Sequence, residues 1–439
     1  MSKPKPHFYR FPTAGLFADY RTLPPTELNV FRAARAFLAF ADMDAVRMAG
    51  LLGAGPMLPV NLILEVLPSW KKYSRIAEEA FGTTVLEQLR QCVRLALNDG
   101  PSPKAYYLAG MAEHHGGAEI DNYIHDQFHE TLIEFCRYAV QRLHGVQREL
   151  DDKMVFEQHC REFDLPCIET FLRVEVNGNV RQVTDRSLDR ARHASSLFIK
   201  PARGSQGKSA ERWDKCGTGY GDTSGTSVSD FDGLLNHLSH QAGAIGRDLL
   251  VQEAAVNPSR VRAFGGRALS TVRLVTFRTA DGIIQPIHAG TRIACNDDAA
   301  VDNYHAGGIY FHVDYRTGLI GKGALGNFSD QPEYFSKAPA SDHQLTGKSV
   351  EGWKQLENLA VNLHEKLTFD TVGGWDVALT DKGPVAVECN TVPGMSSNPQ
   401  RYYKGFLGTE YSKKLCSEIV TFLDQLAPAG SRFRFRVRT

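Results

Sequence analysis

Two carboxylates and an amide, Asp376, Glu388 and Asn390, have a spacing that predicts a metal site. Residues 381–383 (Asp-Lys-Gly) are a hairpin-loop signal between two apolar runs. With these residues as the loop, Asp376 and Glu388 come opposite each other, and the two-residue period of a strand puts Asn390 on their side. Carboxylates directly opposite repel each other unless a cation lies between them. Oxygen ligands of this kind favour Mg²⁺ over Zn²⁺.

This hairpin register makes further predictions. The other cross-strand pairs are expected to be Thr380 with Pro384 and Ala378 with Ala386. The core-facing side chains are expected to be Val377, Leu379, Val385 and Val387. The alternative is an exposed hairpin whose acids face solvent, and a bulge in the loop would shift the register by one residue.

An apolar strand ending at Lys200 is followed by a loop that contains Gly204, Ser205, Gln206, Gly207 and Lys208. The backbone N–H groups and cations of such a loop can lie along a polyphosphate. Residues 202–209 also fit a relaxed phosphate-loop pattern, but a phosphate loop must open into a helix. Here the chain continues into Trp213 and a glycine-rich tract, so we interpret Lys200 as a strand lysine beneath a flexible glycine flap.

Two further segments have weaker signals. The glycine-rich tract from Gly217 to Ser227 is typical of a mobile surface loop, and it could help to close over a nucleotide. The apolar run 249–255 turns polar at its end, where Gln252 or Glu253 could read the amino group of an adenine. Taken alone, the second pattern is better explained by an ordinary strand terminus.

Arg273 and Arg292 each lie in an alternating segment and should point away from their apolar neighbours. If that face is a cleft, their planar guanidinium groups could bind a γ-phosphate and then an acyl phosphate. The alternative for each is a surface salt bridge.

The histidines offer less. His125 and His129 have the i, i+4 spacing of a zinc site, but no third ligand is evident, so a solvated or half-buried pair is expected. His305, with Asn303, Gly307 and Gly308 around it, is a candidate substrate-side group, although loop histidines commonly satisfy backbone carbonyls.

Composition limits the class of protein. The 439 residues predict two or three domains, and the 50 basic and 50 acidic side chains give no net charge that would favour a nucleic-acid partner. No apolar run has the length of a membrane span, and residues 1–10 lack the apolar core of a secretory signal. Eight scattered cysteines predict reduced thiols and a cytoplasmic location. The alternating basic and apolar residues 432–438 predict a protected edge strand.

The patterns along the chain predict an α+β protein. Residues 26–145 read as helical, and strands predominate after Asp151, beginning with 172–176 and 179–183 around an Asn-Gly turn. Later helices are expected at 153–163, 231–238, 352–367 and 411–426. We expect a helical N-terminal domain over 1–150, a lid subdomain over 151–255 with the glycine flap, and a core subdomain over 256–439 with the metal site and a C-terminal helix.

Taken in order, these segments resemble the ATP-grasp superfamily, and more narrowly its sugar-transfer-associated group. The resemblance covers about residues 151–398 and has six elements in the family's order. They are Lys153 in an opening helix, Lys200 with the flap 204–208, the hinge 251–253, the Ser-Thr-Val-Arg strand 270–273, the segment 302–308, and the metal ligands Asp376, Glu388 and Asn390. Serine replaces the group's asparagine at Ser270.

The resemblance implies an ATP-grasp fold, in which two α+β subdomains enclose ATP behind the helical N-terminal domain. It implies that Lys153, Lys200 and the flap contact ATP phosphates, that Gln252 and Glu253 lie at the adenine, and that one or two Mg²⁺ ions, or Mn²⁺, bind the metal ligands. Arg273, Arg292 and Lys200 would be catalytic. No Asp or Glu lies between Glu253 and Asp281, so the ribose contact is unassigned.

The implied activity is that of an ATP-dependent carboxylate–amine ligase, a C–N bond-forming and ADP-producing enzyme, acting through an acyl phosphate. Its substrates would be a small-molecule or peptide-like biosynthetic acid and an amine, and the N-terminal helices could bind a protein partner. Three alternatives remain open. These are a small-molecule kinase on the same scaffold, a phosphate-loop ATPase using residues 202–209, and a non-catalytic ATP-binding protein.

Overall fold

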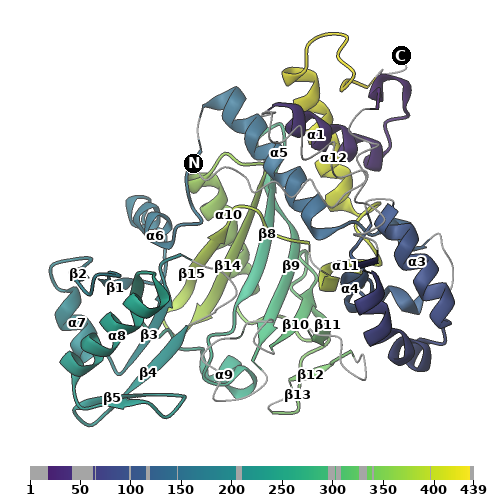
Figure 1. The fold of residues 1–439 in the computed structure, drawn as a ribbon. Helices are drawn as coiled ribbons and strands as arrows, with labels where there is room; N and C mark the ends of the chain where they lie inside the picture. Colours follow the sequence, from purple (N-terminus) through teal and green to yellow (C-terminus); the bar gives the residue numbers. More distant parts are fainter. Residues whose placement is uncertain are drawn as a thin grey trace.

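The computed structural model describes residues 18–41, 63–64, 66–97, 100–114, 119–145, 147–203, 210–294, 302, 308–325, 334–338, 341–395 and 397–435 (Figure 1). The fold is α+β, with a helical N-terminal region followed by two antiparallel sheets. Figure 1 shows the two sheets side by side, with the N-terminal helices against the second of them.

The N-terminal region is helical, as predicted. Its helices are α1 (Glu27–Ala41), a helix over 66–81, α3 (Val85–Leu97), α4 (Pro103–Leu108) and α5 (Asp126–His144), with short 3₁₀ turns at Tyr20–Thr22, Met111–Glu113 and Glu119–Asn122. Thr84 caps α3 by accepting the backbone N–H of Glu87 at 3.3 Å. The exposed apolar side chains of Ile63, Leu64, Leu67 and Leu86 lie on this region.

The seven-stranded sheet follows a short helix, α6 (Lys153–Glu162). Its strand order is β2-β1-β7-β3-β4-β5-β6. The strands are β1 (Thr170–Val174), β2 (Val180–Gln182), β3 (Ser196–Pro201), β4 (Glu211–Cys216), β5 (Gly219–Asp222), β6 (Ser227–Val228) and β7 (Leu249–Glu253). The helices α7 (Ser187–His193) and α8 (Phe231–Ile245) contribute apolar side chains to the core on one face. The other face keeps Phe198 and Lys200 of β3 and Gln252 of β7.

The six-stranded sheet has the order β11-β10-β9-β8-β14-β15. Its strands are β8 (Val272–Arg278), β9 (Ile284–Ile293), β10 (Ile309–Val313), β11 (Ile320–Leu325), β14 (Val372–Thr380) and β15 (Gly383–Asn390). The short helix α9 (Ser259–Gly265) precedes it, and β12 (Lys337–Ala338) and β13 (His343–Gln344) form a small ribbon. One face packs on α10 (Trp353–Leu367) through Trp375, Val377 and Leu274.

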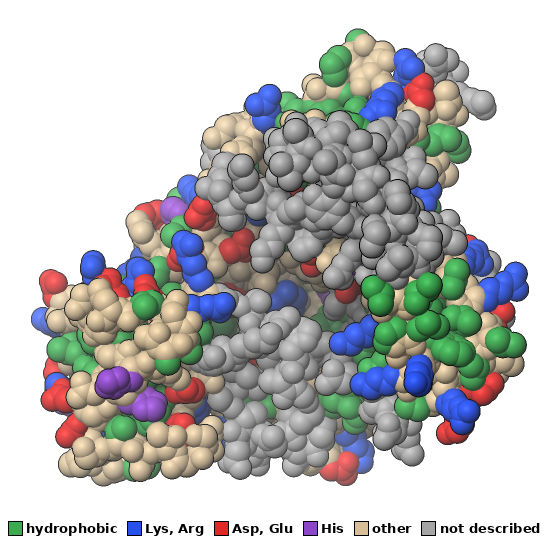
Figure 2. Space-filling model, in the orientation of Figure 1, with side chains coloured by type: hydrophobic (Ala, Val, Ile, Leu, Met, Phe, Trp, Pro, Cys, Tyr) green, Lys and Arg blue, Asp and Glu red, His purple; other side chains and the backbone are tan. Residues whose placement is uncertain are grey.

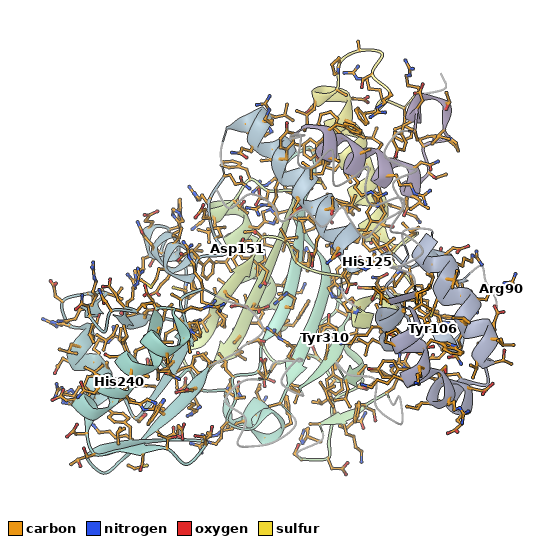
Figure 3. All side chains as sticks on the ribbon, in the orientation of Figure 1. Arg90, Tyr106, His125, Asp151, His240 and Tyr310 are labelled. Atoms are coloured by element: carbon orange, nitrogen blue, oxygen red, sulfur yellow. The ribbon has the colours of Figure 1, made fainter. Side chains whose placement is uncertain are left out.

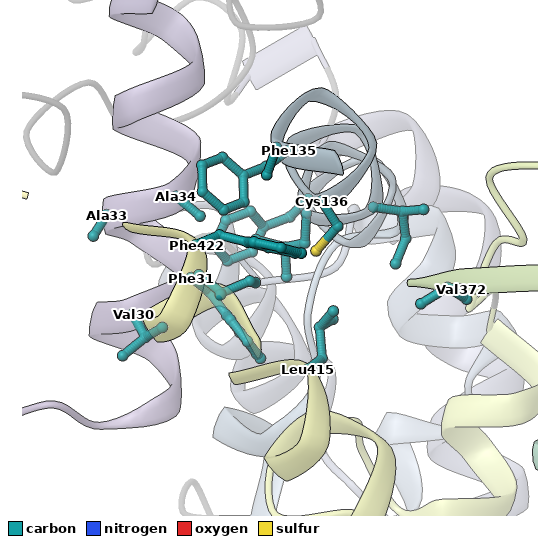
Figure 4. Close-up of a cluster of buried hydrophobic side chains, with 14 of the residues drawn as sticks. Val30, Phe31, Ala33, Ala34, Phe135, Cys136, Val372, Leu415 and Phe422 are labelled. Carbon is teal, nitrogen blue, oxygen red and sulfur yellow. The ribbon is translucent and has the colours of Figure 1, made fainter. Parts of the chain in front are cut away.

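The N-terminal helices cover part of the opposite face. A core of buried side chains joins α1, α5 and α12 (Glu410–Leu426) to Val275, Phe277 and Val372 of the sheet. Figure 4 shows Phe31, Phe135 and Phe422 from three helices meeting in this core, with Val372 at its edge. α11 (Ser397–Tyr403) lies against α4 and against β10 of the sheet. The N-terminal region is therefore packed directly onto the sheet.

The two sheets are joined along β15. The backbone of residues 166–168 pairs with Ala386, since Ile168 N donates to Ala386 O and Ala386 N donates to Pro166 O, each at 2.9 Å. Lys382, in the hairpin loop, adds an ion pair with Glu253 at the end of β7, at 3.1 Å. These contacts place the seven-stranded sheet beside the hairpin that carries the predicted metal ligands.

Two predictions are wrong. The tract 217–227 is not a surface loop, because it forms β5, β6 and their connections, and a Cβ at Gly219 would lie 2.2 Å from Val228 O. The described part of the predicted C-terminal strand, 432–435, is not a strand; there Phe433 and Phe435 pack on the helical core. Both errors have the same cause, because a local pattern of residue types does not show which distant segment a strand pairs with or packs against.

The surface and the helices add two observations. Figure 2 shows basic and acidic side chains interspersed over the described part of one face, with hydrophobic side chains gathered on the N-terminal region. Among the described helices, none combines the length and the apolar content that a membrane-spanning helix needs.

Candidate active site

The β14–β15 hairpin brings Asp376 opposite Glu388, as predicted, but by a different register. The loop is one residue shorter than expected, because Thr380 pairs with Gly383, and Val377 pairs with Ala386. Val387 is the extra residue of a β-bulge, and the bulge restores the pairing of Asp376 with Glu388 and of Gly374 with Asn390. The predicted pairs of Thr380 with Pro384 and of Ala378 with Ala386 are wrong.

The bulge also changes which β15 side chains face the core. Ala386 and Cys389 belong to the buried cluster beneath α10, instead of the predicted Val385 and Val387. On β14, Val377 and Leu379 do contribute to that cluster, as predicted. Because the strand alternates regularly beyond the bulge, Glu388 and Asn390 share the other face.

Asp376 is buried between two arginines. Arg273, its direct cross-strand partner on β8, donates to Asp376 Oδ1 through Nε and to Oδ2 through Nη2 at 2.9 Å. Arg292 on β9 donates to Oδ2 at 2.6 Å. Burial disfavours the charge on Asp376, but the two guanidinium groups outweigh it and hold the pKa of this carboxyl below its usual value. Both arginines point away from their apolar neighbours, as predicted.

Glu388 has a different environment. Its carboxylate is half-buried, and no hydrogen-bond or ion-pair partner is found for it in the described part of the chain. Burial and the neighbouring Asp376 raise its pKa, against Lys200 and Lys153. The amide nitrogen of Asn390 is buried and likewise lacks a partner among the described residues. Two polar groups of the predicted metal set are therefore available to a ligand.

Lys200 faces this pair from the seven-stranded sheet. Its side chain is buried, and burial lowers its pKa to about 8, against the attraction of Glu388 and with the repulsion of Lys153. Lys153 is the first residue of α6, whose N-cap Asp152 accepts the backbone N–H of Met154 at 3.0 Å. The two predicted phosphate-binding lysines thus lie near the predicted metal ligands.

The predicted adenine-reading residues are both engaged by protein groups. Gln252 lies on the same face as Lys200, but its amide donates to Thr170 Oγ1 at 2.9 Å. Glu253 pairs with Lys382. Their side chains would have to exchange partners to read a base.

Sequence reasoning missed the groups that orient Arg292. Asp302, which is buried, accepts the Thr271 backbone N–H at 2.8 Å and its hydroxyl at 2.6 Å. The Thr271 hydroxyl in turn accepts from Arg292 Nε at 3.0 Å and Nη2 at 2.8 Å. Thr271 and Asp302 lie in two of the six segments that carry the family resemblance, which was the available signal.

A second group missed from the sequence continues the row of polar side chains along the sheet. Tyr310, labelled in Figure 3, pairs with Arg292 across β9 and β10. Its hydroxyl lies 2.7 Å from His288 Nε2. Burial and nearby Arg273 lower the pKa of His288 to about 3, so its ring is neutral. Next to it, the His312 ring stacks on Tyr402 of α11 with centroids 3.4 Å apart.

Several predicted residues lie outside the described residues. These are Gly204, Ser205, Gln206, Gly207 and Lys208 of the flap, and Asn303, His305 and Gly307. Gly308 is described, buried, and directly precedes β10. The chain continues from residue 210 into strand β4, which does not provide the helix that a phosphate loop requires.

The i, i+4 histidines have structural roles. His125 is the N-cap of α5 and accepts the Gln127 backbone N–H at 3.1 Å (Figure 3). His129 is fully buried and lies 3.1 Å from the Tyr411 hydroxyl.

The donor set fits a hard divalent cation. No cluster of three His, Cys, Asp or Glu side chains suited to a metal occurs among the described residues, so the candidate set is two carboxylates and an amide. The Glu388 carboxylate is unpartnered among the described residues, and oxygen ligands such as this carboxylate and the Asn390 amide oxygen suit Mg²⁺. The Asn390 amide nitrogen, which has no partner in the described part of the chain either, is a hydrogen-bond donor and suits a phosphate oxygen instead. Asp376 can bind an ion only if it gives up a hydrogen bond from Arg273 or Arg292.

One protein family and several solved structures are similar to this chain. The family described as sugar-transfer-associated ATP-grasp matches residues 143–404. No curated protein matches the sequence. Similar solved structures include a D-alanine–D-alanine ligase from Bacillus anthracis, with 11% identity, a TM-score of 0.35, and coverage of 63% of this chain and 68% of that one.

A second similar structure is a D-cycloserine synthetase, with 13% identity, a TM-score of 0.32, and coverage of 76% of this chain and 92% of that one. These distant similarities add no argument about activity. The family match spans more than half of the chain and includes the hairpin, the two lysines and both arginines. The chain belongs to the sugar-transfer-associated ATP-grasp family.

Proposed function

We propose that this protein is an ATP-dependent carboxylate–amine ligase that forms an amide through an acyl phosphate, on a small-molecule or peptide-like biosynthetic substrate. The observation that carries the proposal is the row of charged side chains across the six-stranded sheet. It runs from Glu388 and Asn390 through Asp376 to Arg273 and Arg292, with Lys200 facing its first members.

We propose that the two ends of this row of charged side chains have different tasks, one binding the phosphates of ATP and the other binding the carboxylate substrate. Lys200 and Lys153, beside Glu388 and Asn390, would hold the phosphates of ATP, and Mg²⁺ held by Asp376, Glu388 and Asn390 would neutralise phosphate charge there. Arg273 and Arg292 lie next along the sheet and would bind the oxygens of the carboxylate and of the acyl phosphate. Thr271 and Asp302 fix the orientation of Arg292 before the substrate arrives.

The proposed chemistry has two steps. The carboxylate oxygen attacks the γ-phosphorus, ADP leaves, and the acyl phosphate that results is held by the arginines. An amine then attacks the acyl carbon, phosphate leaves, and the nitrogen loses a proton. Water must be kept away during this interval, because an acyl phosphate hydrolyses.

The test is ADP release by the full-length protein in a matrix of carboxylic acids and amines, with the product identified by mass. The proposal expects ADP that requires both an acid and an amine, together with free phosphate and an amide. Phosphorylation of a hydroxyl, with no amine-dependent ADP for any acid, would instead establish a kinase on the same scaffold. The Glu388→Gln variant is the control, and it should release no ADP above background.

A further inference from the structure

The residue directly after the candidate metal-binding segment is held by groups from outside the sheet. Thr391 follows Asn390 and is buried. Its backbone N–H donates to Asp151 Oδ1 at 3.0 Å, and its hydroxyl donates to Asp151 Oδ2 at 2.5 Å. The hydroxyl also accepts from Arg137 Nη1 at 2.9 Å. One threonine thus uses its hydroxyl as donor and acceptor and its backbone as donor.

Asp151 connects this position to the lysine side of the site. It precedes Asp152, the N-cap of α6, and Lys153, the first residue of that helix. Figure 3 shows Asp151 where the chain leaves the N-terminal helices and approaches the sheet. Its contact with Thr391 therefore ties the start of α6 to the end of β15.

Arg137 connects both strands of the hairpin to the N-terminal region. It lies on α5, and besides Thr391 it contacts Asp370, whose Oδ2 accepts from Arg137 Nε at 3.2 Å. Asp370 is buried and lies just before β14, the strand of Asp376. The Arg137 side chain is only 17% exposed, so this ion pair is largely shielded from water. One guanidinium group thus holds the start of β14 and the end of β15.

The position of α5 makes this connection informative. Arg137 lies before residue 143, outside the segment that the ATP-grasp family covers. α5 is nevertheless fixed against the sheet by Phe135, Cys136 and Val140, which pack in the same core as Val372 at the start of β14. An arginine on such a helix has little freedom to move independently of the hairpin.

We propose that Arg137 is a positioning residue for the metal and nucleotide site, acting through Thr391 and Asp151, so that the N-terminal helical region is part of the working site. The inference rests on the proposed function, because it takes Glu388 and Asn390 as ligands for Mg²⁺–ATP. Mutation of a residue that orients metal ligands typically lowers the affinity for the metal on the order of 10- to 100-fold.

The experiment compares conservative and disruptive variants of the full-length protein. Thr391→Val keeps the shape of the side chain and removes both hydroxyl hydrogen bonds, whereas Thr391→Ser keeps the hydroxyl. Arg137→Lys keeps the charge but cannot reach Asp370 and Thr391 through a planar fork. The control is Arg148→Ala. Arg148 hydrogen-bonds the backbone oxygens of Lys366 and Leu367 at the end of α10, not the ends of the hairpin strands.

Three quantities are measured for each variant. They are the Kd of Mg²⁺–ATP by calorimetry, thermal stability, and hydrogen exchange of the segment that contains Thr391. We expect Thr391→Val and Arg137→Lys to weaken Mg²⁺–ATP binding about tenfold or more and to speed exchange at Thr391. We expect Thr391→Ser to bind like the wild type, and Arg148→Ala to alter stability without altering the Kd.

The outcomes separate this inference from the proposed function. If the wild type does not bind Mg²⁺–ATP, the proposed function fails, whatever the variants do. If the wild type binds but Thr391→Val binds equally well, the positioning role is wrong and the proposed function stands. A loss of affinity in Arg148→Ala that matches the loss in Arg137→Lys would also overturn the positioning role, because it would show a general effect of stability.

Discussion

Arg273 on β8 and Asp376 on β14 are direct cross-strand partners, and the arginine donates to both oxygens of the carboxylate. Arg292 adds a third hydrogen bond to the same group. Asp376 therefore holds the two candidate catalytic arginines in place and is also a candidate metal ligand. Both of its oxygens already accept hydrogen bonds from arginines, so metal binding would have to replace one of these contacts. A substitution here should have consequences beyond the loss of a metal ligand.

Replacing Asp376 with asparagine should destabilise the metal-free protein. The change removes the ion-pair partner of Arg273 and leaves Arg292, among the described residues, with only Asp302, 4.0 Å away. Breaking a buried ion pair costs about 3 kcal/mol or more. Urea unfolding of the metal-free protein measures the difference in free energy of unfolding. ATP turnover should also be lost, whereas the phosphate-loop alternative would leave it largely intact.

The Glu388→Gln substitution should not destabilise the metal-free protein. The Glu388 carboxylate has no partner among the described residues, and burial with the nearby Asp376 raises its pKa. Removal of its charge should therefore leave the metal-free protein equally stable or slightly more stable. Binding of Mg²⁺–ATP should nevertheless be weakened. Equal destabilisation by Asp376→Asn and Glu388→Gln would contradict the different environments assigned to them.

Nucleotide affinity should fall as pH rises above about 8. Burial lowers the pKa of Lys200 to about 8, so its positive charge is present below this pH and is lost above it. Each further pH unit should weaken ATP binding up to about tenfold, as measured by calorimetry from pH 7 to 9.5. In Lys200→Arg the charge persists, so the affinity of that variant should not change over the same range.

The lowered pKa of Lys200 should also make the stability of the protein depend on pH. The unfolded chain binds a proton at this lysine up to its ordinary pKa of about 10.5, whereas the folded chain releases it above about 8. Between these values the unfolded state binds more protons, so the stability of the wild type should rise with pH. The Lys200→Met substitution should remove this contribution in urea unfolding. An identical pH slope in the variant would show that Lys200 keeps its ordinary pKa.

Gly290 should be necessary for the position of Tyr310. A Cβ at Gly290 would lie 2.0 Å from the Tyr310 hydroxyl oxygen and 2.1 Å from the ring carbon that bears it. Gly290→Ala should displace the ring, break its contact with His288, and lower the free energy of unfolding by about 1–3 kcal/mol. Gly321→Ala is the control, because its nearest contact, Tyr402 Cε2, lies 3.1 Å away and needs a smaller shift. Thermal unfolding of both variants tests the contrast.

Local sequence patterns predicted the direction in which a side chain points better than they predicted its hydrogen-bond partners. Alternation in the sequence placed Arg273 and Arg292 on the face of Asp376, because strand geometry fixes the side on which each residue lies. Their common partner could not be predicted, since Asp376 lies 103 and 84 residues later in the chain. The same limit applies to Thr271 and Asp302, which meet across 31 residues. Such contacts depend on the order of strands in the sheet.

The hairpin shows how a correct pair can follow from an incorrect register. The Asp-Lys-Gly loop signal predicted a three-residue loop, and the two errors, a shorter loop and an omitted bulge at Val387, cancel at Asp376 and Glu388. They do not cancel at Val385 and Val387, which leave the core. Deciding between the two registers requires knowing that Ala386 and Cys389 fill the space beneath α10, and packing of that kind is absent from a local pattern.

Acid should destabilise the protein through His129. This side chain is fully buried between the rings of Phe406 and Tyr411, and burial lowers its pKa to about 3. Below its ordinary pKa of 6.5 the unfolded chain binds a proton that the folded chain excludes, so stability should fall as pH falls from about 6.5 towards 3. One histidine contributes a slope of up to about 1.4 kcal/mol per pH unit.

The His129→Gln substitution should make this slope shallower by that amount, because glutamine does not titrate, although it should lower stability at neutral pH by disturbing the contact with Tyr411. Urea unfolding at pH 7, 6, 5 and 4 separates the two effects, since only the titration changes with pH. The exposed His193 provides the control, and His193→Gln should leave the slope as it is in the wild type. If His129→Gln and the wild type have parallel pH profiles, His129 is protonated within the folded protein, and its contact with Tyr411 must tolerate the charge.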